Sequence, residues 1–285
     1  MRQPSPFPPY FTIRAFLEKW FKAEGGQRRS SLWSWIILLI GFIYFFLPLF
    51  ATFEFSLRML KGRYTFEAYR VAFNDPRFYQ EFGFSLLWAV LTIIISLVLI
   101  VPTAYWVHLR LPRLRPMVEF VTLMPFVVPA VVLVFGLIRV YGRYTFFVSV
   151  PILLIAGYVV LSLPYMFRAV DAGLRAIDVR TLTEAAQSLG AGWGTILFRV
   201  IFPNLRVAIL SGVFLTFAIV MGEFTFAALL VWPAFGPYME EIGAMRAYTP
   251  QALSVVSFLL TWGSIGLIQR IARGAPGQGQ IAGAR

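Results

Sequence analysis

The sequence contains no cysteine and a single histidine, His108. Without cysteine, the chain has neither a disulfide framework nor a thiolate nucleophile. With one histidine, a histidine-rich metal site or a histidine-centred triad has no second member. We therefore expect no metal or cofactor, and we expect His108 to be a residue at the flank of a membrane span.

Lysine is also scarce, since the chain has only Lys19, Lys22 and Lys61. A phosphate-binding loop requires the pattern G-x-x-x-x-G-K-S/T, and none of these lysines follows such glycines. An intramembrane aspartic protease would require two carboxylates within spans, and Glu223 is the one candidate. We therefore expect that the chain is not an enzyme.

Charged residues make up 13% of the chain, against 59% hydrophobic and 17% aromatic residues, with a mean hydropathy of +0.75. This composition is typical of an all-α polytopic membrane protein. Six windows are long enough to cross a hydrocarbon core of about 30 Å. They are residues 30–53, 82–107, 120–138, 144–167, 207–239 and 247–269, of which the fifth is interrupted by Glu223. The third contains Pro125 and Pro129, which predict a kink or local unwinding.

Orientation follows from lysine and arginine, which are in excess in cytoplasmic loops. Six spans place both termini on one side, and the loops of that side carry 17 of the 25 basic residues. Both termini of this multi-pass membrane protein are therefore predicted to be cytoplasmic. The net charge of +12 reflects this topology rather than nucleic-acid binding, because no basic run exceeds two adjacent residues.

Three regions are expected along the chain. Residues 1–29 form a cytoplasmic tail, in which residues 11–23 predict an amphipathic helix lying on the inner leaflet. Residues 30–273 form the six-span domain, and residues 274–285 form a flexible cytoplasmic tail. The segment 168–206 is the cytoplasmic loop between the fourth and fifth spans.

This loop contains a short predicted helix. Thr181 and Glu184 fit a T-x-x-E capping box, and Gly190 is placed to end the helix in the left-handed conformation. An apolar stripe occupies positions i, i+3, i+4 and i+7, namely Leu182, Ala185, Ala186 and Leu189. A helix this short is marginal in water, so it must pack into a groove of another protein or onto this protein's own surface. Pro203 marks the turn toward the fifth span.

The same loop resembles a known signature. Glu184-Ala185-Ala186, three residues, Gly190, nine residues and Val200-Ile201-Phe202-Pro203 are similar to E-A-A-x3-G-x9-I-x-L-P, the EAA motif in permease subunits of binding-protein-dependent ABC importers. Five of the seven specified positions are identical, while Val200 and Phe202 are apolar replacements. Leu163-Pro164-Tyr165 and Gly222-Glu223-Phe224 are similar to flanking patterns of this family, and of its polyamine, iron(III) and aminoethylphosphonate branch.

The resemblance implies a type I importer (MetI-like) permease fold and a set of partners. These are two ATPase subunits, a second permease that is identical or related, an extracytoplasmic substrate-binding protein and the lipid bilayer. The chain would form half of the translocation path and couple to an ATPase through the EAA loop. The coupling residues would be Thr181, Glu184, Ala185, Ala186, Leu189, Gly190 and Pro203.

Two questions stay open at this point. Glu223 could line the path of a cationic solute, or it could form a structural pair with Arg139, Arg143 or Arg246. The chain could also be a stand-alone six-span channel or secondary transporter, although a single intramembrane acid gives little support for ion coupling. On the outer side, residues 57–80 and 235–246 are the natural landing surface for a binding protein.

Overall fold

The computed structural model describes residues 32–60 and 62–273, so the predicted helix over residues 11–23 and both terminal tails lie outside the described residues. Apart from an isolated β-bridge between Leu60 and Arg63, every regular element in these ranges is a helix. The chain divides into two units, residues 1–51 and 52–285, and each is described by itself. The first contributes most of α2 (Leu32–Ser56), which is long and apolar enough to cross a membrane from Ser34 to Ser56.

The second unit contains all the other helices. In chain order they are α3 (Glu67–Phe73), α4 (Pro76–Arg110), η2 (Pro112–Leu114), α5 (Arg115–Val127), α6 (Ala130–Tyr141), α7 (Thr145–Ser149), α8 (Ile152–Arg175), α9 (Val179–Ser188), α10 (Trp193–Thr195), η3 (Ile196–Ile201), α11 (Phe202–Asn204), α12 (Arg206–Gly222), α13 (Thr225–Leu229), α14 (Phe235–Met245) and α15 (Thr249–Arg273).

Three helices of the described residues, α2, α4 and α8, are single candidates for membrane spans, and two bent pairs raise the number to five. The pair α5 and α6 is bent by 98° at a break that contains Pro129. The kink predicted for the third window is therefore confirmed, because proline removes a backbone donor and ends the preceding helix. The sixth window corresponds to α15, in which Thr249–Leu260 is an apolar segment. A count of six spans stays a prediction.

The fifth predicted window, residues 207–239, is not one continuous helix. The helix α12 ends at Gly222, and Glu223 is extended, with φ −78° and ψ 125°. Two shorter helices, α13 and α14, follow, and between them Val231 has a φ of +57°. Composition alone hid the break, because the residues after Gly222 stay apolar. Further on, Pro233 lies in the segment before α14 and prevents a continuous helix there.

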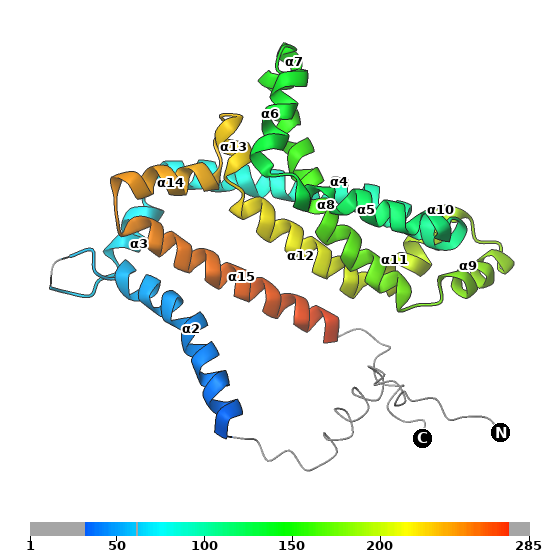
Figure 1. The fold of residues 1–285 in the computed structure, drawn as a ribbon, viewed down its shortest axis with the longest axis horizontal. Helices are drawn as coiled ribbons and strands as arrows, with labels where there is room; N and C mark the ends of the chain where they lie inside the picture. Colours follow the sequence, from blue (N-terminus) through cyan, green and yellow to red (C-terminus); the bar gives the residue numbers. More distant parts are fainter. Residues whose placement is uncertain (1–31, 61, 274–285) are drawn as a thin grey trace, which may run out of the picture. The chain divides into compact units, whose positions relative to one another are not determined.

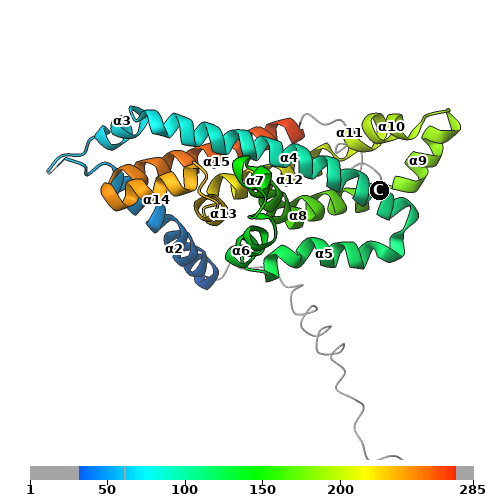
Figure 2. The same cartoon turned by 90° about the horizontal axis from the view of Figure 1, so that it is seen from above.

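The core of the second unit is built from α4, α8 and α12, which lie side by side in Figures 1 and 2. The buried residues of α4 recur every three or four positions and are mostly small: Ala89, Thr92, Ser96, Ile100 and Ala104. Such a stripe allows close approach of helices. Ser96 and Ser162 of α8 share a buried hydrogen bond of 2.7 Å. At Gly212 of α12, an added Cβ would lie 2.7 Å from the sulfur of Met166 on α8, so any larger residue here would have to displace the Met166 side chain.

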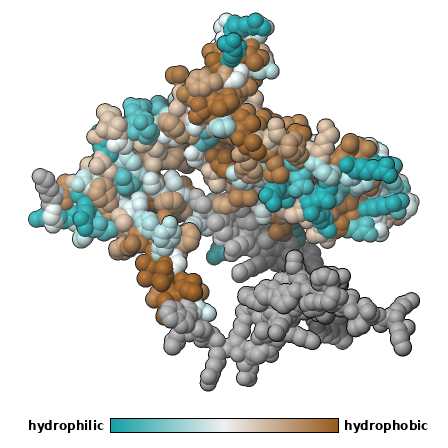
Figure 3. All heavy atoms as spheres, viewed as in Figure 1, coloured by the Kyte–Doolittle hydropathy of each residue, from teal (hydrophilic) through white to brown (hydrophobic). Residues whose placement is uncertain are grey.

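Polar segments gather at two opposite ends of this unit. The helices α9 and α10 lie at one end, whereas α3 and α14 lie at the other (Figures 1 and 2). In Figure 3, hydrophilic residues cluster at the end that carries α9 and α10, while hydrophobic residues cover the part formed by α6. The EAA loop and the predicted outer loops are therefore on opposite ends of the helical core.

Candidate functional site

The helix of the EAA loop, α9, begins three residues earlier than the sequence predicts. Its N-cap is Asp178, whose Oδ1 accepts a hydrogen bond of 3.1 Å from the backbone N–H of Thr181. The Thr181 hydroxyl donates to Asp178 Oδ2 at 2.7 Å. These bonds hold the pKa of the Asp178 carboxyl below its usual value, first through the Thr181 hydroxyl and then through the Thr181 N–H. Aspartate is a strong N-cap because it satisfies a free backbone donor of the first turn.

The predicted capping box of Thr181 and Glu184 is therefore wrong. Thr181 already lies inside the helix, so its hydroxyl serves the Asp178 carboxylate rather than the N–H of Glu184. The Glu184 carboxylate accepts from Arg180 Nε at 2.7 Å, one turn earlier on the same helix. Both side chains of this pair are largely exposed to solvent.

The end of α9 confirms the role predicted for Gly190, whose φ is +80°. The N–H of Gly190 donates to the carbonyl of Gln187 at 2.9 Å, and the N–H of Ala191 donates to the carbonyl of Ala186 at 3.0 Å. These two bonds form a Schellman motif, which closes the last turn of the helix. The helix therefore has ten residues with a defined start and a defined end.

The predicted apolar stripe is divided between two faces of α9. Val179, Thr183 and Ala186 are buried, and Val179 and Ala186 belong to the core cluster formed mainly by α4 and α8. Ala185 is exposed, and Leu189 is 88% exposed. One face of the helix thus packs on this chain, while the Ala185 and Leu189 side faces outward.

Side chains from α4 fix the inner face of this loop. The hydroxyls of Tyr105 on α4 and Thr183 on α9 lie 2.9 Å apart, in a buried position. One residue further along α4, the Trp106 ring meets the Trp193 ring of α10 edge-on, with centroids 5.4 Å apart. The guanidinium of Arg110 lies 5.8 Å from the centre of the Trp193 ring, within the range of a cation–π contact.

Pro203 lies where the loop turns into the next helix. It is in α11, directly after the π-helix η3 (Ile196–Ile201). The segment from Trp193 to Asn204 is bent by 79° relative to α12, with the break at Leu205, a buried residue. A proline here removes a backbone donor, and the wider π turn precedes it. The seven predicted coupling residues therefore share one loop, with Pro203 at its far end.

Glu223 lies in a different part of the second unit and has a local structural role. Its carboxylate accepts from the backbone N–H groups of Thr225 and Phe226, both at 2.8 Å, and so caps α13. Within the described residues no ion pair joins it to Arg139, Arg143 or Arg246, so the structure does not support the alternative of a structural arginine pair. Two backbone donors satisfy the charge instead, because the chain is extended at Glu223 and turns back over it.

The neighbours of Glu223 in the chain line a pocket. Gly222 and Phe224 contribute to a largely apolar cavity of about 370 Å³ between α12, α14 and α15, together with Met221 and Phe235. The Glu223 side chain is not among the residues that line this cavity. The geometry therefore favours the capping role of Glu223 over direct contact with a solute.

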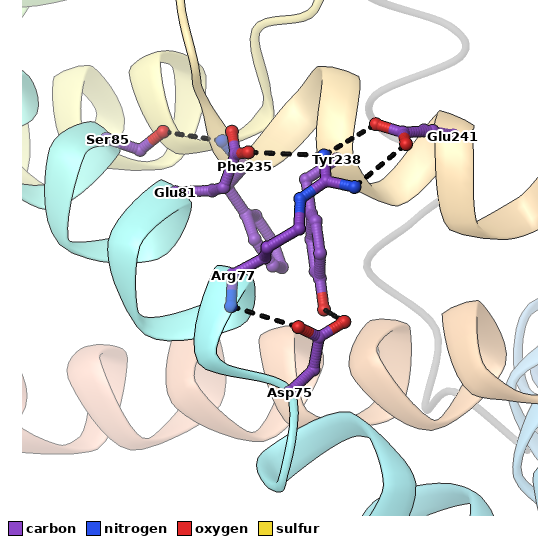
Figure 4. Close-up of polar contacts among 7 residues, drawn as sticks. All are labelled: Asp75, Arg77, Glu81, Ser85, Phe235, Tyr238 and Glu241. Atoms are coloured by element: carbon purple, nitrogen blue, oxygen red, sulfur yellow. Dashed lines mark hydrogen bonds and ion pairs between the residues drawn. The ribbon is translucent and has the colours of Figure 1, made fainter.

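The two predicted outer segments meet in a polar cluster, shown in Figure 4. Arg77, at the start of α4, donates to both carboxylate oxygens of Glu241 on α14, at 2.8 and 2.7 Å. Its guanidinium also lies 5.8 Å from the centre of the Tyr238 ring, and the Tyr238 hydroxyl donates to Asp75 at 3.2 Å. The Arg77 hydrogen bonds hold the pKa of Glu241 below its usual value. Below them, Phe78, Phe235 and Tyr238 form part of a core cluster.

Sequence reasoning missed two features of the segment 168–206, which contains the EAA loop. Asp178 was detectable, because an aspartate directly before a helix is a usual start signal. The contact of His108 Nε2 with Asp171 Oδ1, at 2.8 Å, was not detectable, because the two residues are 63 positions apart. His108 therefore belongs to a buried charge cluster in addition to flanking a span.

Comparisons with known proteins agree with this geometry. Residues 100–273 match the family described as binding-protein-dependent transport system inner membrane component. The chain is 31% identical over 188 residues to the spermidine/putrescine transport system permease protein PotB of Haemophilus influenzae, covering 58% of this chain and 63% of PotB. It is 32% identical over 149 residues to the molybdenum transport system permease protein ModB of Azotobacter vinelandii, covering 48% of this chain and 65% of ModB. The chain thus spans less than two thirds of these curated relatives.

Two solved structures show the same fold. A bacterial ABC transporter involved in the import of the acidic polysaccharide alginate has a TM-score of 0.64 at 14% identity, over 85% of this chain and 97% of that chain. The inward-facing methionine ABC transporter MetNI has a TM-score of 0.52 at 18% identity, over 68% of this chain and 93% of that chain. The match over residues 100–273 covers more than half of the chain, so the chain belongs to the family of inner membrane components of binding-protein-dependent transport systems.

Proposed function

We propose that the chain is the membrane-spanning permease subunit of an ATP-driven solute importer. It forms half of the translocation path and receives force from a separate ATPase subunit at α9. The observation that carries this proposal is the division of α9 into two faces. One is fastened to the core through Thr183 and Ala186, and the other presents Ala185 and the 88% exposed Leu189.

The exposed face of α9 suits insertion into a groove of a partner. Ten residues make a rod of about 15 Å. Ala185 is small, so a groove wall can approach closely, and Leu189 offers a large apolar side chain at the tip. Burying the apolar side chain of Leu189 in a partner removes its surface from water, and this transfer lowers the free energy of the complex. The inner face is already occupied by this chain, so self-packing does not account for the outer one.

The construction of the loop suits transmission of force. Both ends of α9 are fixed, by Asp178 and by the Schellman motif at Gly190. The helix follows α8 after three residues, and η3 and α11 connect it to α12. A displacement of α9 as a rigid body would therefore act on two candidate spans together, as in domain closure driven by a ligand.

The remaining partners and the orientation are part of the same proposal and are inferred by similarity to the family. A second permease would complete the path, two ATPase subunits would seat on the two coupling helices, and a binding protein would dock on the outer side. The coupling loop 168–206 and both termini would face the cytoplasm, within a 30–273 membrane domain. The Arg77–Glu241 contact places segments 57–80 and 235–246 at the same end, as their proposed common location on the outer side requires.

A stand-alone channel or secondary transporter is not favoured. Ion coupling requires a carboxylate within the membrane that is free to bind and release the ion. Glu223 is the intramembrane acid predicted from the sequence, and both of its oxygens accept backbone hydrogen bonds at 2.8 Å. A carboxylate held in this way caps a helix, and its exchange with an ion would break both bonds.

Polyamines are the first solutes to test. The matched segment shared with PotB of Haemophilus influenzae, a spermidine/putrescine permease by name, extends over 188 residues, against 149 for ModB of Azotobacter vinelandii. Uptake of labelled putrescine and of labelled molybdate by cells that express the complete transporter distinguishes the two. Uptake of putrescine alone supports the polyamine assignment, and uptake of molybdate alone overturns it.

The test of the proposed function is co-purification of the cognate ATPase subunit with the tagged chain. The wild-type chain should retain the ATPase, and Ala185→Asp should lose it, because a buried charge in the groove has no partner. Ala244→Asp is the matched control, since Ala244 is exposed on α14 at the opposite end of the unit. Retention of the ATPase by Ala185→Asp, or its absence from the wild-type sample, would overturn the proposal.

A further inference from the structure

A buried carboxylate joins three helices close to α9. Asp171, on the last turns of α8, is 4% exposed. Its Oδ1 accepts from His108 Nε2 at 2.8 Å and from Arg115 Nε at 2.9 Å. Its Oδ2 accepts from Arg115 Nη2 at 3.1 Å and from Arg175 one turn later on α8. Both oxygens are therefore fully used.

The three donors come from different elements. His108 is in the last turn of α4, Arg115 is the first residue of α5, and Arg175 is the last residue of α8. The bidentate contact of Arg115 fixes both distance and orientation between α5 and α8. One carboxylate thus holds the adjacent ends of α4, α5 and α8 together.

The cluster requires the negative charge of Asp171. The side chains of His108, Arg115 and Arg175 are 14%, 28% and 51% exposed. Without the carboxylate, two guanidinium groups and an imidazole would lie close together with no negative charge between them. His108 and Arg115, which are the more buried of the three side chains, would lose their charged partner. Removing one member of a buried ion pair leaves the others uncompensated. A neutral residue at position 171 would therefore loosen the three helix ends.

The cluster is connected to the coupling helix through α4. Tyr105 and His108 are three positions apart, so they lie on the same face of that helix. Tyr105 shares its hydrogen bond with Thr183 of α9, and His108 contacts Asp171 of α8. A second connection runs along the chain, since Asp178 caps α9 only seven positions after Asp171. A displacement of α9 reaches the cluster by both routes.

We propose that Asp171 is a positioning residue that makes the cytoplasmic ends of α4, α5 and α8 move as one body when α9 is displaced. This inference rests on the proposed function, because it assumes that an ATPase subunit displaces α9. Without Asp171, α9 still docks and the ATPase still turns over, but the displacement no longer reaches α5. ATP hydrolysis then continues without matching transport.

The test uses the complete transporter, reconstituted in vesicles with its cognate ATPase, partner permease and binding protein. For Asp171→Asn, the ATPase subunit should co-purify as in wild type, and the solute transported per ATP hydrolysed should fall by about tenfold, a usual size for lost coupling. Asp171→Glu keeps the charge and should recover part of this ratio. Glu119→Gln on α5 is the matched control, since Glu119 forms no ion pair among the described residues, and it should leave the ratio unchanged.

A second measurement separates positioning from general destabilisation. The chain has no cysteine, so Met117→Cys on α5 and Ala176→Cys after α8 introduce two defined sites for spin labels. Met117 and Ala176 are both exposed, so the labels can be attached there. With Asp171 present, the distance between the labels should stay the same with and without ATP. With Asp171→Asn, its distribution should broaden when ATP is added.

The outcomes distinguish this inference from the proposed function. If no ATPase co-purifies with the wild-type chain, the proposed function is wrong. If the ATPase co-purifies with Asp171→Asn and the transport ratio or the label distance is unchanged, the positioning role of Asp171 is overturned while the proposed function stands. If Asp171→Asn is absent from the membrane and Asp171→Glu shows a normal ratio with a broad distance distribution, the positioning role is overturned as well.

Discussion

The hydroxyls of Tyr105 and Thr183 lie 2.9 Å apart and join the longest helix of the core to the inner face of α9. Thr183 also donates to the carbonyl of Val179 at 2.6 Å, so its hydroxyl serves as donor there and as acceptor for Tyr105. This arrangement decides which side of α9 is available to a partner. The side that carries Thr183 is held by this chain, and the side that carries Ala185 and Leu189 is exposed among the described residues.

Replacing Tyr105 with phenylalanine removes this hydrogen bond and little else. A buried hydrogen bond contributes about 0.5–1.5 kcal/mol to stability, so the free energy needed to open α9 locally should fall by that amount. Hydrogen exchange of the α9 amides should be faster in Tyr105→Phe, with unchanged exchange in α12. Tyr79→Phe, at an exposed tyrosine near the opposite end of α4, should leave α9 exchange as in wild type. Equal protection of α9 in both variants would contradict the attachment.

Glycine is needed at position 190 because the backbone is in the left-handed conformation, and not because a side chain would clash there. An added Cβ at this position would meet no atom within 4 Å, whereas φ is +80°. Gly190→Ala should therefore cost about 1–2 kcal/mol from backbone conformation alone, and Gly190→Asn less, because asparagine tolerates this region. Gly192→Ala, at a glycine with open surroundings and a φ of −75°, should be tolerated. The measurement is solute uptake with ATPase co-purification, and similar uptake in Gly190→Ala and Gly190→Asn would contradict the conformational explanation.

The Asp178 cap predicts a pH dependence of α9. Hydrogen bonds from the Thr181 hydroxyl and N–H lower the pKa of Asp178 in the folded state. The cap therefore stabilises α9 fully above the ordinary aspartate value of about 3.9, and this contribution is lost as pH falls through the lowered pKa. Hydrogen exchange of α9, corrected for intrinsic rates, should show weaker protection below that pH. In Asp178→Asn this change should be absent, and an identical pH response in both proteins would argue against the cap.

The capping role of Glu223 predicts different effects on membrane abundance for two substitutions of this residue. Glu223→Ala leaves the N–H groups of Thr225 and Phe226 without their acceptors, which costs about 1–3 kcal/mol for a buried donor. Membrane abundance should fall for this variant. Glu223→Gln keeps one acceptor oxygen and should retain more of the abundance, with an unchanged preference between cationic and anionic solutes. Normal abundance in Glu223→Gln, together with loss of uptake of a cationic solute alone, would restore the solute-contact role.

If the polar cluster of Arg77 and Glu241 lies on the proposed outer side, its loss should affect the binding protein rather than folding. Arg77 and Glu241 are each 49% exposed, so their contact adds little to stability. It does fix α14 against α4 (Figure 4). Arg77→Glu should reduce stimulation of ATP hydrolysis by the binding protein, and the double variant Arg77→Glu with Glu241→Arg should recover it. Failure of the charge exchange to recover stimulation would show that the contact is not what matters there.

Local signals in the sequence predicted part of this site. Pro129 and Gly190 act through their own backbone geometry, so the bend between α5 and α6 and the end of α9 followed from the sequence. The start of α9 was misplaced because two capping patterns overlap, and Asp178 forms the cap in place of Thr181. The hydropathy of the fifth window could not reveal the break at Gly222.

Features that depend on distant contacts were not predictable in this way. Arg115 and His108, which donate hydrogen bonds to Asp171, are 56 and 63 positions away from it in the sequence. Contacts over such separations produce no periodic pattern in the sequence. The two faces of α9 could not be predicted either. Helical spacing assigns Ala186 and Leu189 to one stripe, whereas in the structure Ala186 is buried and Leu189 is exposed. The resemblance to the EAA motif identified the loop, and the structure shows which of its residues face outward.

The most direct test of the central claim is a cross-link from the tip of α9. Leu189→Cys introduces the one cysteine of the chain at an 88% exposed position. In membranes that contain the complete transporter, a photoactivatable probe on this cysteine should label the ATPase subunit, and added ATP should change the yield. Labelling of lipid or of this chain alone, with the ATPase subunit unlabelled, would contradict the account.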